Sequence, residues 1–360
     1  MNSHQPEITA LHITRFIAAF CVVAYHYGKS AVPFSEGLLH TLIQNGGMAV
    51  SYFFALSGFI MTYAYQSNKA VSYKSFLWSR IARIYPVYLF SFILVLLLMY
   101  LFKESKPKGI SIILQALCMQ AWKPGISMEI NYVSWSISVE MLFYLLFPFI
   151  INYLQKKSIN TILFQSIILW LCSLIVHVWM VKNISSPERF NVGQLIAFFP
   201  PWHFNSFVLG AAFAIIYVQK LKSWSAHNWL SVALIVLSSI LIYLFFIVQP
   251  ISLGYLTNGG IVPIFLILIL GISLNTGNIK KLLSLKPLIW LGEISYGFYL
   301  WQFFIYLFFE KYLMSSSAVM PTSVFYLYIM TLILCAALSY HLLELPLKRF
   351  IKNRFVVQRI

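Results

Sequence analysis

The sequence contains no aspartate, and all nine of its acidic residues are glutamate. Charged residues make up only 9% of the 360 residues, whereas 60% are hydrophobic and the mean hydropathy is +0.81. A soluble globular domain has about 25% charged residues. The composition therefore indicates an integral membrane protein, and it excludes every catalytic or metal site that requires an aspartate.

Cysteine is also scarce, with four residues in the chain. Cys21, Cys118, Cys172 and Cys335 lie in apolar runs without CxxC spacing. We therefore expect free thiols and no metal site. The net charge of +16 comes from basic residues in short loops between apolar runs, a pattern typical of membrane topology, so we expect no nucleic-acid partner.

Long apolar runs dominate the rest of the chain. About 20 predominantly apolar residues are needed to cross a bilayer as a helix. Ten stretches satisfy this length: residues 8–27, 46–66, 84–102, 134–154, 160–181, 203–219, 229–248, 258–274, 288–309 and 324–343. The sequence predicts an all-α integral membrane bundle of about ten helices over residues 1–345, followed by a basic cytoplasmic tail, 346–360.

The distribution of lysine and arginine predicts the orientation. With both termini in the cytoplasm, the inner segments and the tail carry 16 basic residues and the outer loops carry eight. An alternative topology has an eleventh span at 110–122 and the first three helices in the opposite orientation. It gives the same 16 inner and eight outer basic residues. Because 10 to 14 apolar residues more often form a re-entrant or interfacial helix, we interpret 110–122 as such a segment.

The first predicted span, RFIAAFCVVAYHY, holds two ionisable residues, Arg15 and His26. Eleven residues correspond to nearly three whole turns, so both side chains share one helix face about 16 Å apart. Ionisable side chains within a span are costly and usually functional. The alternative is an arginine that reaches the inner surface and a histidine at the outer interface.

The segment SRIARIYP places Arg80 and Arg83 one turn apart, and Pro86 is expected to open the third span. Two guanidinium groups on one face suit a phosphate-bearing ligand. The alternative is ordinary positive-inside anchoring. In GGMAVSYFFALSGFIM, by contrast, Ser51, Ser57 and Gly58 predict close helix packing.

Polar side chains crowd the predicted outer end of the fourth span, SWSISVEMLFY. They are Trp135, Ser136, Ser138 and Glu140, which the alternation of spans places level with His26. A carboxylate there can orient the imidazole or raise its basicity. The alternative is a glutamate that is hydrogen-bonded within the bundle.

The predicted arginines on the cytoplasmic side and the histidine near the outer side suit acyl-coenzyme A. This long molecule has phosphates, which the arginines could bind, at one end and the thioester at the other. His26 could remove the proton of an acceptor hydroxyl or could carry the acyl group itself. The alternative from another class is a glycan transporter or export component without acyl transfer.

Six motifs in order over nearly the whole chain resemble the membrane acyltransferase 3 family. They are R-x10-H (15–26), FFALSGF (53–59), RIARIYP (80–86), WSISVEMLFYLLFP (135–148), WLGEISYGFYLWQ (290–302) and ELP (344–346). The resemblance implies a ten-helix bundle in a bacterial inner membrane. It implies transfer of an acyl group, usually acetyl, from cytoplasmic acyl-CoA to an extracytoplasmic carbohydrate or its lipid-linked precursor, with no tightly bound cofactor.

Carried over by motif, Arg15 and His26 match the family's essential pair, Arg80 and Arg83 match its RxxR, and Glu140 matches the acid of WSxxxE. Two positions depart from the pattern. Gln302 stands where many members have histidine, and Ser51 where many have an acidic residue. The role of the missing histidine is therefore in doubt in this chain.

Overall fold

The computed structural model describes residues 7–67, 72–102, 106–184, 190–248, 256–314 and 319–355. Within these ranges all regular structure is helical, which confirms the predicted all-α class. Residues 356–360, the end of the predicted tail, lie outside the described residues. So do some of the basic residues counted above for the orientation, and with Arg359 of the tail these are Lys69, Lys103, Arg189 and Arg359.

Eight helical segments of the described chain are long and apolar enough to cross a membrane. They are Thr9–Tyr27, Gly46–Tyr65, Tyr73–Phe102, Tyr132–Leu154, Ile159–Asn183, Asn191–Ser225, Asn228–Val248 and Thr322–Arg354. The shorter apolar α11 (Val262–Leu274) and the 27-residue α13 (Lys286–Tyr312) occupy the positions of the eighth and ninth predicted spans. Each of the ten predicted spans therefore has a helix at its place.

The ambiguous run 110–122 forms no continuous helix. It contains α5 (Gly109–Ala116), of eight residues, and a 3-10 turn at Gln120–Trp122. Eight residues extend about 12 Å, less than half of the roughly 30 Å hydrocarbon layer. This length agrees with the interpretation of 110–122 as a re-entrant or interfacial segment.

The chain forms two compact units, each built from three sequence segments. Unit 1 comprises Met1–Ala18, Met48–Val71 and Leu146–Gly292, and unit 2 comprises Ala19–Gly47, Ser72–Leu145 and Glu293–Ile360. Helices α1 (His12–Tyr27), α6 (Trp135–Leu154) and α13 each contribute residues to both units. The predicted boundary between a membrane domain, 1–345, and a basic tail, 346–360, stays a prediction.

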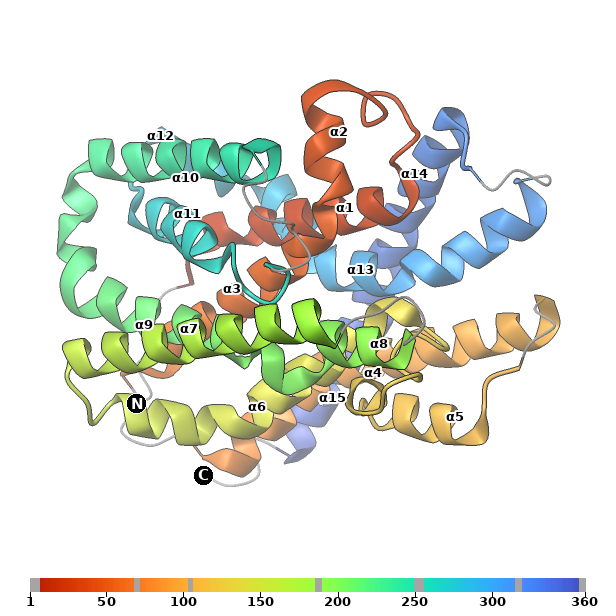
Figure 1. Cartoon of the computed structure of the whole chain (residues 1–360), viewed down its shortest axis with the longest axis horizontal. Coiled ribbons are helices and arrows are strands. Elements are labelled where there is room, and N and C mark those ends of the chain that lie inside the picture. Colours follow the sequence, from red (N-terminus) through yellow and green to blue (C-terminus); the bar gives the residue numbers. More distant parts are fainter. Residues whose placement is uncertain are drawn as a thin grey trace. The chain divides into compact units, whose positions relative to one another are not determined.

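Unit 1 is organised around a close approach of α3 (Ala49–Tyr65) and α9 (Phe204–Ile216) (Figure 1). A Cβ atom on Gly58 would overlap the carbonyl oxygen of Phe207, and one on Gly210 would overlap that of Ala55. The two glycines therefore let the helix backbones touch, which confirms the packing role predicted for Gly58. The remaining helices of this unit are α7 (Ile159–Asn183), α8 (Phe190–Phe198), α10 (Asn228–Val248), α11 and α12 (Asn278–Leu283).

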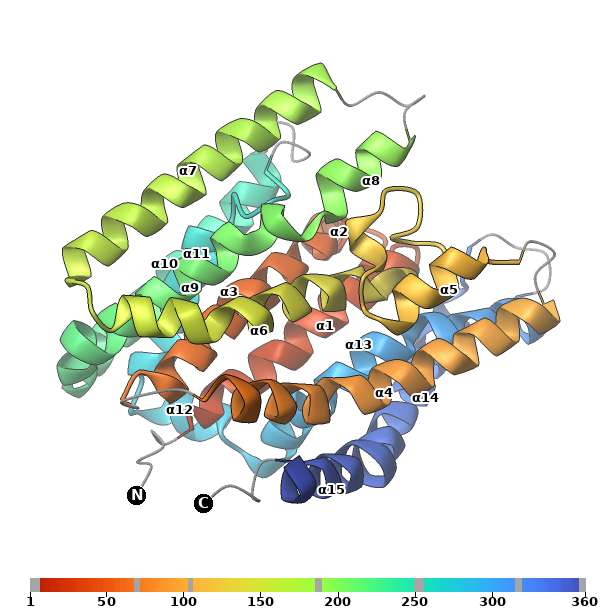
Figure 2. The same cartoon turned by 90° about the horizontal axis from the view of Figure 1, so that it is seen from below.

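Unit 2 contains the longest helix, α4 (Tyr73–Phe102), and α15 (Leu345–Phe355) lies beside it (Figure 2). Pro86 lies inside α4, so the expectation that Pro86 opens the span is wrong. Proline is tolerated within membrane helices because neighbouring groups satisfy the freed carbonyl. The other helices of this unit are α2 (Gly37–Gln44), α5 and α14 (Thr322–Ser339).

Candidate active site

His26 lies in the last turn of α1, where a side chain of α13 holds its imidazole within unit 2. Nδ1 of His26 is 2.7 Å from Oε1 of Gln302. The two residues are 276 positions apart in the chain. Sequence reasoning identified Gln302 only as a departure from a family pattern, and no spacing signal pointed to this contact.

Gln302 is fully buried, and it is fixed at both its side chain and its backbone. Its Nε2 donates a hydrogen bond of 2.7 Å to the carbonyl oxygen of Tyr299, one turn earlier on α13. The hydroxyl of Tyr328 on α14 donates a bond of 2.8 Å to the backbone carbonyl oxygen of Gln302. The position of the amide is therefore determined by two helices.

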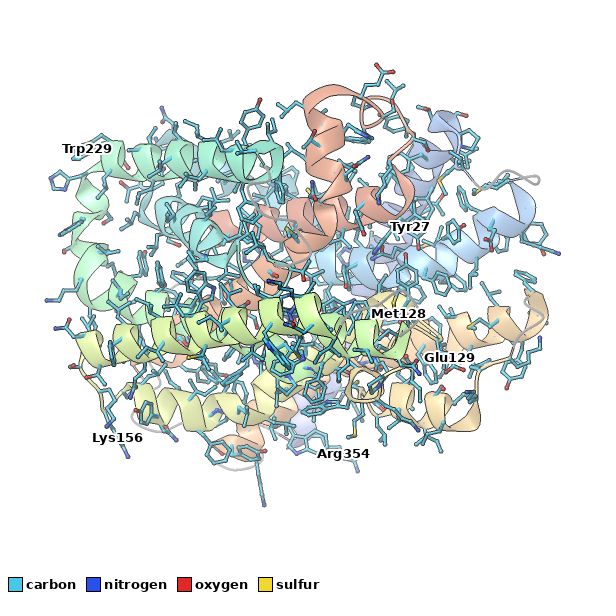
Figure 3. The ribbon with its side chains drawn as sticks, viewed as in Figure 1. Tyr27, Met128, Glu129, Lys156, Trp229 and Arg354 are labelled. Atoms are coloured by element: carbon cyan, nitrogen blue, oxygen red, sulfur yellow. The ribbon has the colours of Figure 1, made fainter. Side chains whose placement is uncertain are left out.

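Tyrosine rings form a wall beside His26. The ring of Tyr132 meets the imidazole edge-on, with 5.0 Å between the centroids. Its hydroxyl donates a 2.8 Å hydrogen bond to the hydroxyl of Tyr27, which is labelled in Figure 3. Tyr27 stacks on Tyr306 at 4.6 Å between centroids. Sequence reasoning missed these tyrosines, although Tyr27 and Tyr132 lie next to the motifs that it used.

The predicted substrate-binding residues at the start of α6 make mainly internal hydrogen bonds. Ser136 is buried and donates a 3.1 Å bond to the hydroxyl of Tyr299. Ser138 is fully buried and donates bonds of 2.6 and 3.0 Å to the carbonyl oxygen of Cys118 and to Oε1 of Gln120. Ser138 thus stabilises the turn after α5, and its predicted role in substrate binding stays a prediction.

Trp135 is the first residue of α6 and is half-buried. Trp135 directly follows the 3-10 turn Tyr132–Ser134, which carries Tyr132 of the wall.

The sequence predicts that the carboxylate of Glu140 orients the imidazole of His26, but the structure shows another group at Nδ1. Gln302 provides the oxygen at Nδ1 of His26, whereas the carboxylate of Glu140 accepts a 2.8 Å hydrogen bond from the hydroxyl of Tyr144. Glu140 also acts electrostatically on Tyr144, as do Arg80 and Arg83. Nδ1 of His26 thus has a partner other than the predicted carboxylate, and the catalytic role of Glu140 stays a prediction.

The predicted phosphate-binding pair lies on α4. Arg80 and Arg83 both act electrostatically on Lys348 of α15, the helix that packs beside α4. The buried Glu344, which precedes α15, acts on the same lysine. The fold thus brings a lysine from the predicted tail within electrostatic range of the arginine pair, which linear spacing could not reveal.

Arg15 lies on α1 in the part of the helix that belongs to unit 1. Its charge acts on the hydroxyl of Tyr52 on α3, which donates a 2.5 Å hydrogen bond to the hydroxyl of Thr14. The predicted spacing along α1 is retained, since the helix runs without a break from His12 to Tyr27.

A second polar cluster in unit 1 was also missed from the sequence. Asn258 donates bonds of 2.9 Å to Nδ1 of His177 and 3.0 Å to the carbonyl oxygen of Ile196. Asn205 donates a 3.1 Å bond to the backbone oxygen of Asn258 and a 2.7 Å bond to the hydroxyl of Ser173. These hydrogen bonds tie the segment before α11 to α7 and α9.

Comparisons with known proteins agree with the motif pattern. A family model described as an acyltransferase domain, acyltransferase 3, matches residues 8–340. The O-acetyltransferase OatA of Staphylococcus aureus is 26% identical over 338 residues, which cover 85% of this chain and 53% of OatA. Acyltransferase MdmB of Streptomyces mycarofaciens is 26% identical over 323 residues, covering 83% of this chain and 78% of MdmB.

A putative acetyltransferase, ORF330 of Acidianus two-tailed virus, is 26% identical over 306 residues, covering 84% of this chain and 83% of ORF330. The chain spans about half the length of its OatA relatives. The comparison with solved structures gives no match. The family model covers most of the chain, and the chain therefore belongs to the acyltransferase 3 family.

Proposed function

We propose that the chain is a membrane O-acyltransferase. It moves an acyl group, in the first instance acetyl, from cytoplasmic acyl-CoA to a hydroxyl of an extracytoplasmic polysaccharide or its lipid-linked precursor. The bacterial inner membrane and cytoplasmic termini are part of the proposal. The observation that carries it is His26, held at the end of a membrane helix beside a wall of tyrosines in a chain of this family.

In the transfer step, His26 acts as a general base. The oxygen of the acceptor hydroxyl forms a bond to the thioester carbonyl carbon while its proton moves to the imidazole. The tetrahedral intermediate then collapses, the carbon–sulfur bond breaks, and the sulfur leaves as CoA thiol with the proton from the imidazolium. General base catalysis of this kind contributes typically about 10² to 10⁴ in rate.

The donor's phosphates would bind the cations of α4 and α15. Arg80 and Arg83 offer forked guanidinium donors, and Lys348 adds a flexible ammonium that is electrostatically coupled to both. The acyl end of the donor would then extend toward the outer end of α1. The pantetheine arm of the donor would have to cover the distance from these cations to His26.

The tyrosine wall supports a carbohydrate acceptor. Flat aromatic faces and phenolic hydroxyls present an apolar body with a polar tip, which suits a sugar ring that has both C–H faces and hydroxyl edges. Tyr27, Tyr132 and Tyr306 supply these groups beside His26. We therefore expect the acceptor hydroxyl to approach the imidazole along this wall.

The test uses the full chain in proteoliposomes, with acetyl-CoA on one side and surface glycan on the other. We expect release of CoA thiol together with an added acetyl mass on the glycan, and only when acetyl-CoA faces the side of the termini. Movement of unmodified glycan across the vesicle without loss of acetyl-CoA would instead identify a transporter and contradict the proposal.

A further inference from the structure

We infer that Gln302 is a positioning residue that selects Nε2 of His26 as the nitrogen that exchanges the proton in acyl transfer. The inference rests on the proposed function and deepens it. It starts from the buried amide of Gln302, whose two ends face different partners.

The orientation of the Gln302 amide is determined by its partners. A backbone carbonyl oxygen only accepts hydrogen bonds, so the group 2.7 Å from the Tyr299 oxygen has to be the amide nitrogen. If the amide were turned over, two oxygens would meet at that distance in a buried site. The amide oxygen of Gln302 therefore faces His26.

An amide oxygen likewise only accepts, so Nδ1 of His26 carries the proton in the 2.7 Å contact with Gln302. Neutral imidazole holds one proton, and its Nε2 then presents a lone pair. Among the residues that the structure describes, Gln302 is the hydrogen-bond partner of this imidazole. Nε2 thus remains available to the acceptor hydroxyl.

The contact also supports the charged intermediate. When Nε2 takes the acceptor's proton, the positive charge spreads over the ring, and the Nδ1–H bond to Gln302 becomes a charge-assisted bond. The groups facing the imidazole are Tyr25, Tyr27 and Tyr132, with Lys29 above the ring of Tyr25 at 3.9 Å. The amide oxygen of Gln302 is a neutral acceptor, so it orients the ring without removing its proton. The imidazolium can therefore give a proton to the departing sulfur of CoA.

The first experiment reads the proton position directly. Full-length protein with isotope-labelled histidine is studied in lipid nanodiscs at neutral pH by solid-state nitrogen NMR, and the His26 signals are assigned by their loss in His26→Gln. We expect Nδ1 protonated and Nε2 unprotonated in the wild type, and a population with Nε2 protonated in Gln302→Met. A wild-type His26 with its proton on Nε2 would overturn the inference.

The second experiment separates positioning from binding. We expect Gln302→Met to lower kcat at saturating acetyl-CoA by about tenfold or more while KM for acetyl-CoA changes less than about twofold. Gln165→Met, on the exposed face of α7, is the matched control with wild-type kcat.

These outcomes separate the inference from the proposed function. A wild-type protein that transfers no acyl group overturns the proposed function, whereas the NMR result still decides which nitrogen Gln302 selects. Equal kcat in Gln302→Met and the wild type overturns the inference and leaves acyl transfer by the chain intact.

Discussion

The hydroxyl of Tyr144 donates a 2.8 Å hydrogen bond to the carboxylate of Glu140, one turn earlier on α6. Arg80 and Arg83 act electrostatically on the same hydroxyl. A carboxylate and a phenol thus accompany the arginine pair, while an uncharged amide holds His26. The carboxylate of Glu140 and the imidazole of His26 therefore have different hydrogen-bond partners.

Loss of Arg80 or Arg83 should weaken binding of acetyl-CoA more than it slows the acyl-transfer step. We expect Arg80→Gln or Arg83→Gln to raise KM for acetyl-CoA by about 10- to 100-fold, because each removes a charge-assisted contact of about 1.5–3 kcal/mol. The measurement is initial rate against acetyl-CoA concentration in proteoliposomes. An unchanged KM in both variants would exclude these arginines from the donor site.

Lys348 provides the test of the third cation. Lys348→Met should raise KM for acetyl-CoA by about tenfold, with kcat nearly unchanged, since it removes a phosphate contact but leaves the imidazole in place. The matched control is Arg349→Met, an exposed position on the same helix. Equal KM values in the two variants would show that Lys348 does not contact the donor.

Ser138 should affect stability rather than substrate binding. Ser138→Ala leaves the buried carbonyl oxygen of Cys118 without the Ser138 donor and removes one of two hydroxyl donors at Oε1 of Gln120, which costs about 1–3 kcal/mol. We expect a lower midpoint of thermal unfolding in detergent and unchanged KM values. Ser239→Ala, at an exposed position of α10, should unfold like the wild type. A raised acceptor KM with wild-type stability would restore the binding role predicted from the sequence.

The crossing of α3 and α9 should tolerate no added side chain. Gly210→Val forces two touching backbones apart, and overpacking of this kind costs typically about 1–3 kcal/mol. Gly193→Ala, whose Cβ would meet nothing within 4 Å, is the control. Thermal unfolding in detergent measures both variants, and equal midpoints would contradict the close approach of these helices.

The helical spans could be predicted from the sequence because apolar length alone determines where a chain can cross a bilayer. Even the short segment near 110–122 followed from its length. The start of α4 was misplaced, since hydropathy registers the apolar part of a helix and says nothing about its polar first turns around Tyr73. Pro86 then looked like a boundary, although it lies within the helix.

The candidate site was only partly predictable for a related reason. Motifs indicated His26 and the arginine pair, because ionisable residues stand out in apolar surroundings. Their partners are ordinary residues from distant segments: Gln302 beside His26, and Lys348 beside Arg83. Such long-range interactions leave no periodic signal along the chain, so the amide at Nδ1 of His26 could not be foreseen.

The central claim concerns the imidazole of His26, and one measurement tests it most directly. Purified wild-type protein and His26→Gln are compared in proteoliposomes for CoA thiol released from acetyl-CoA in the presence of glycan acceptor. With equal thermal stability of the two proteins, the account predicts that release by His26→Gln falls by about 100-fold or more. Release at the wild-type rate from the folded variant would contradict it.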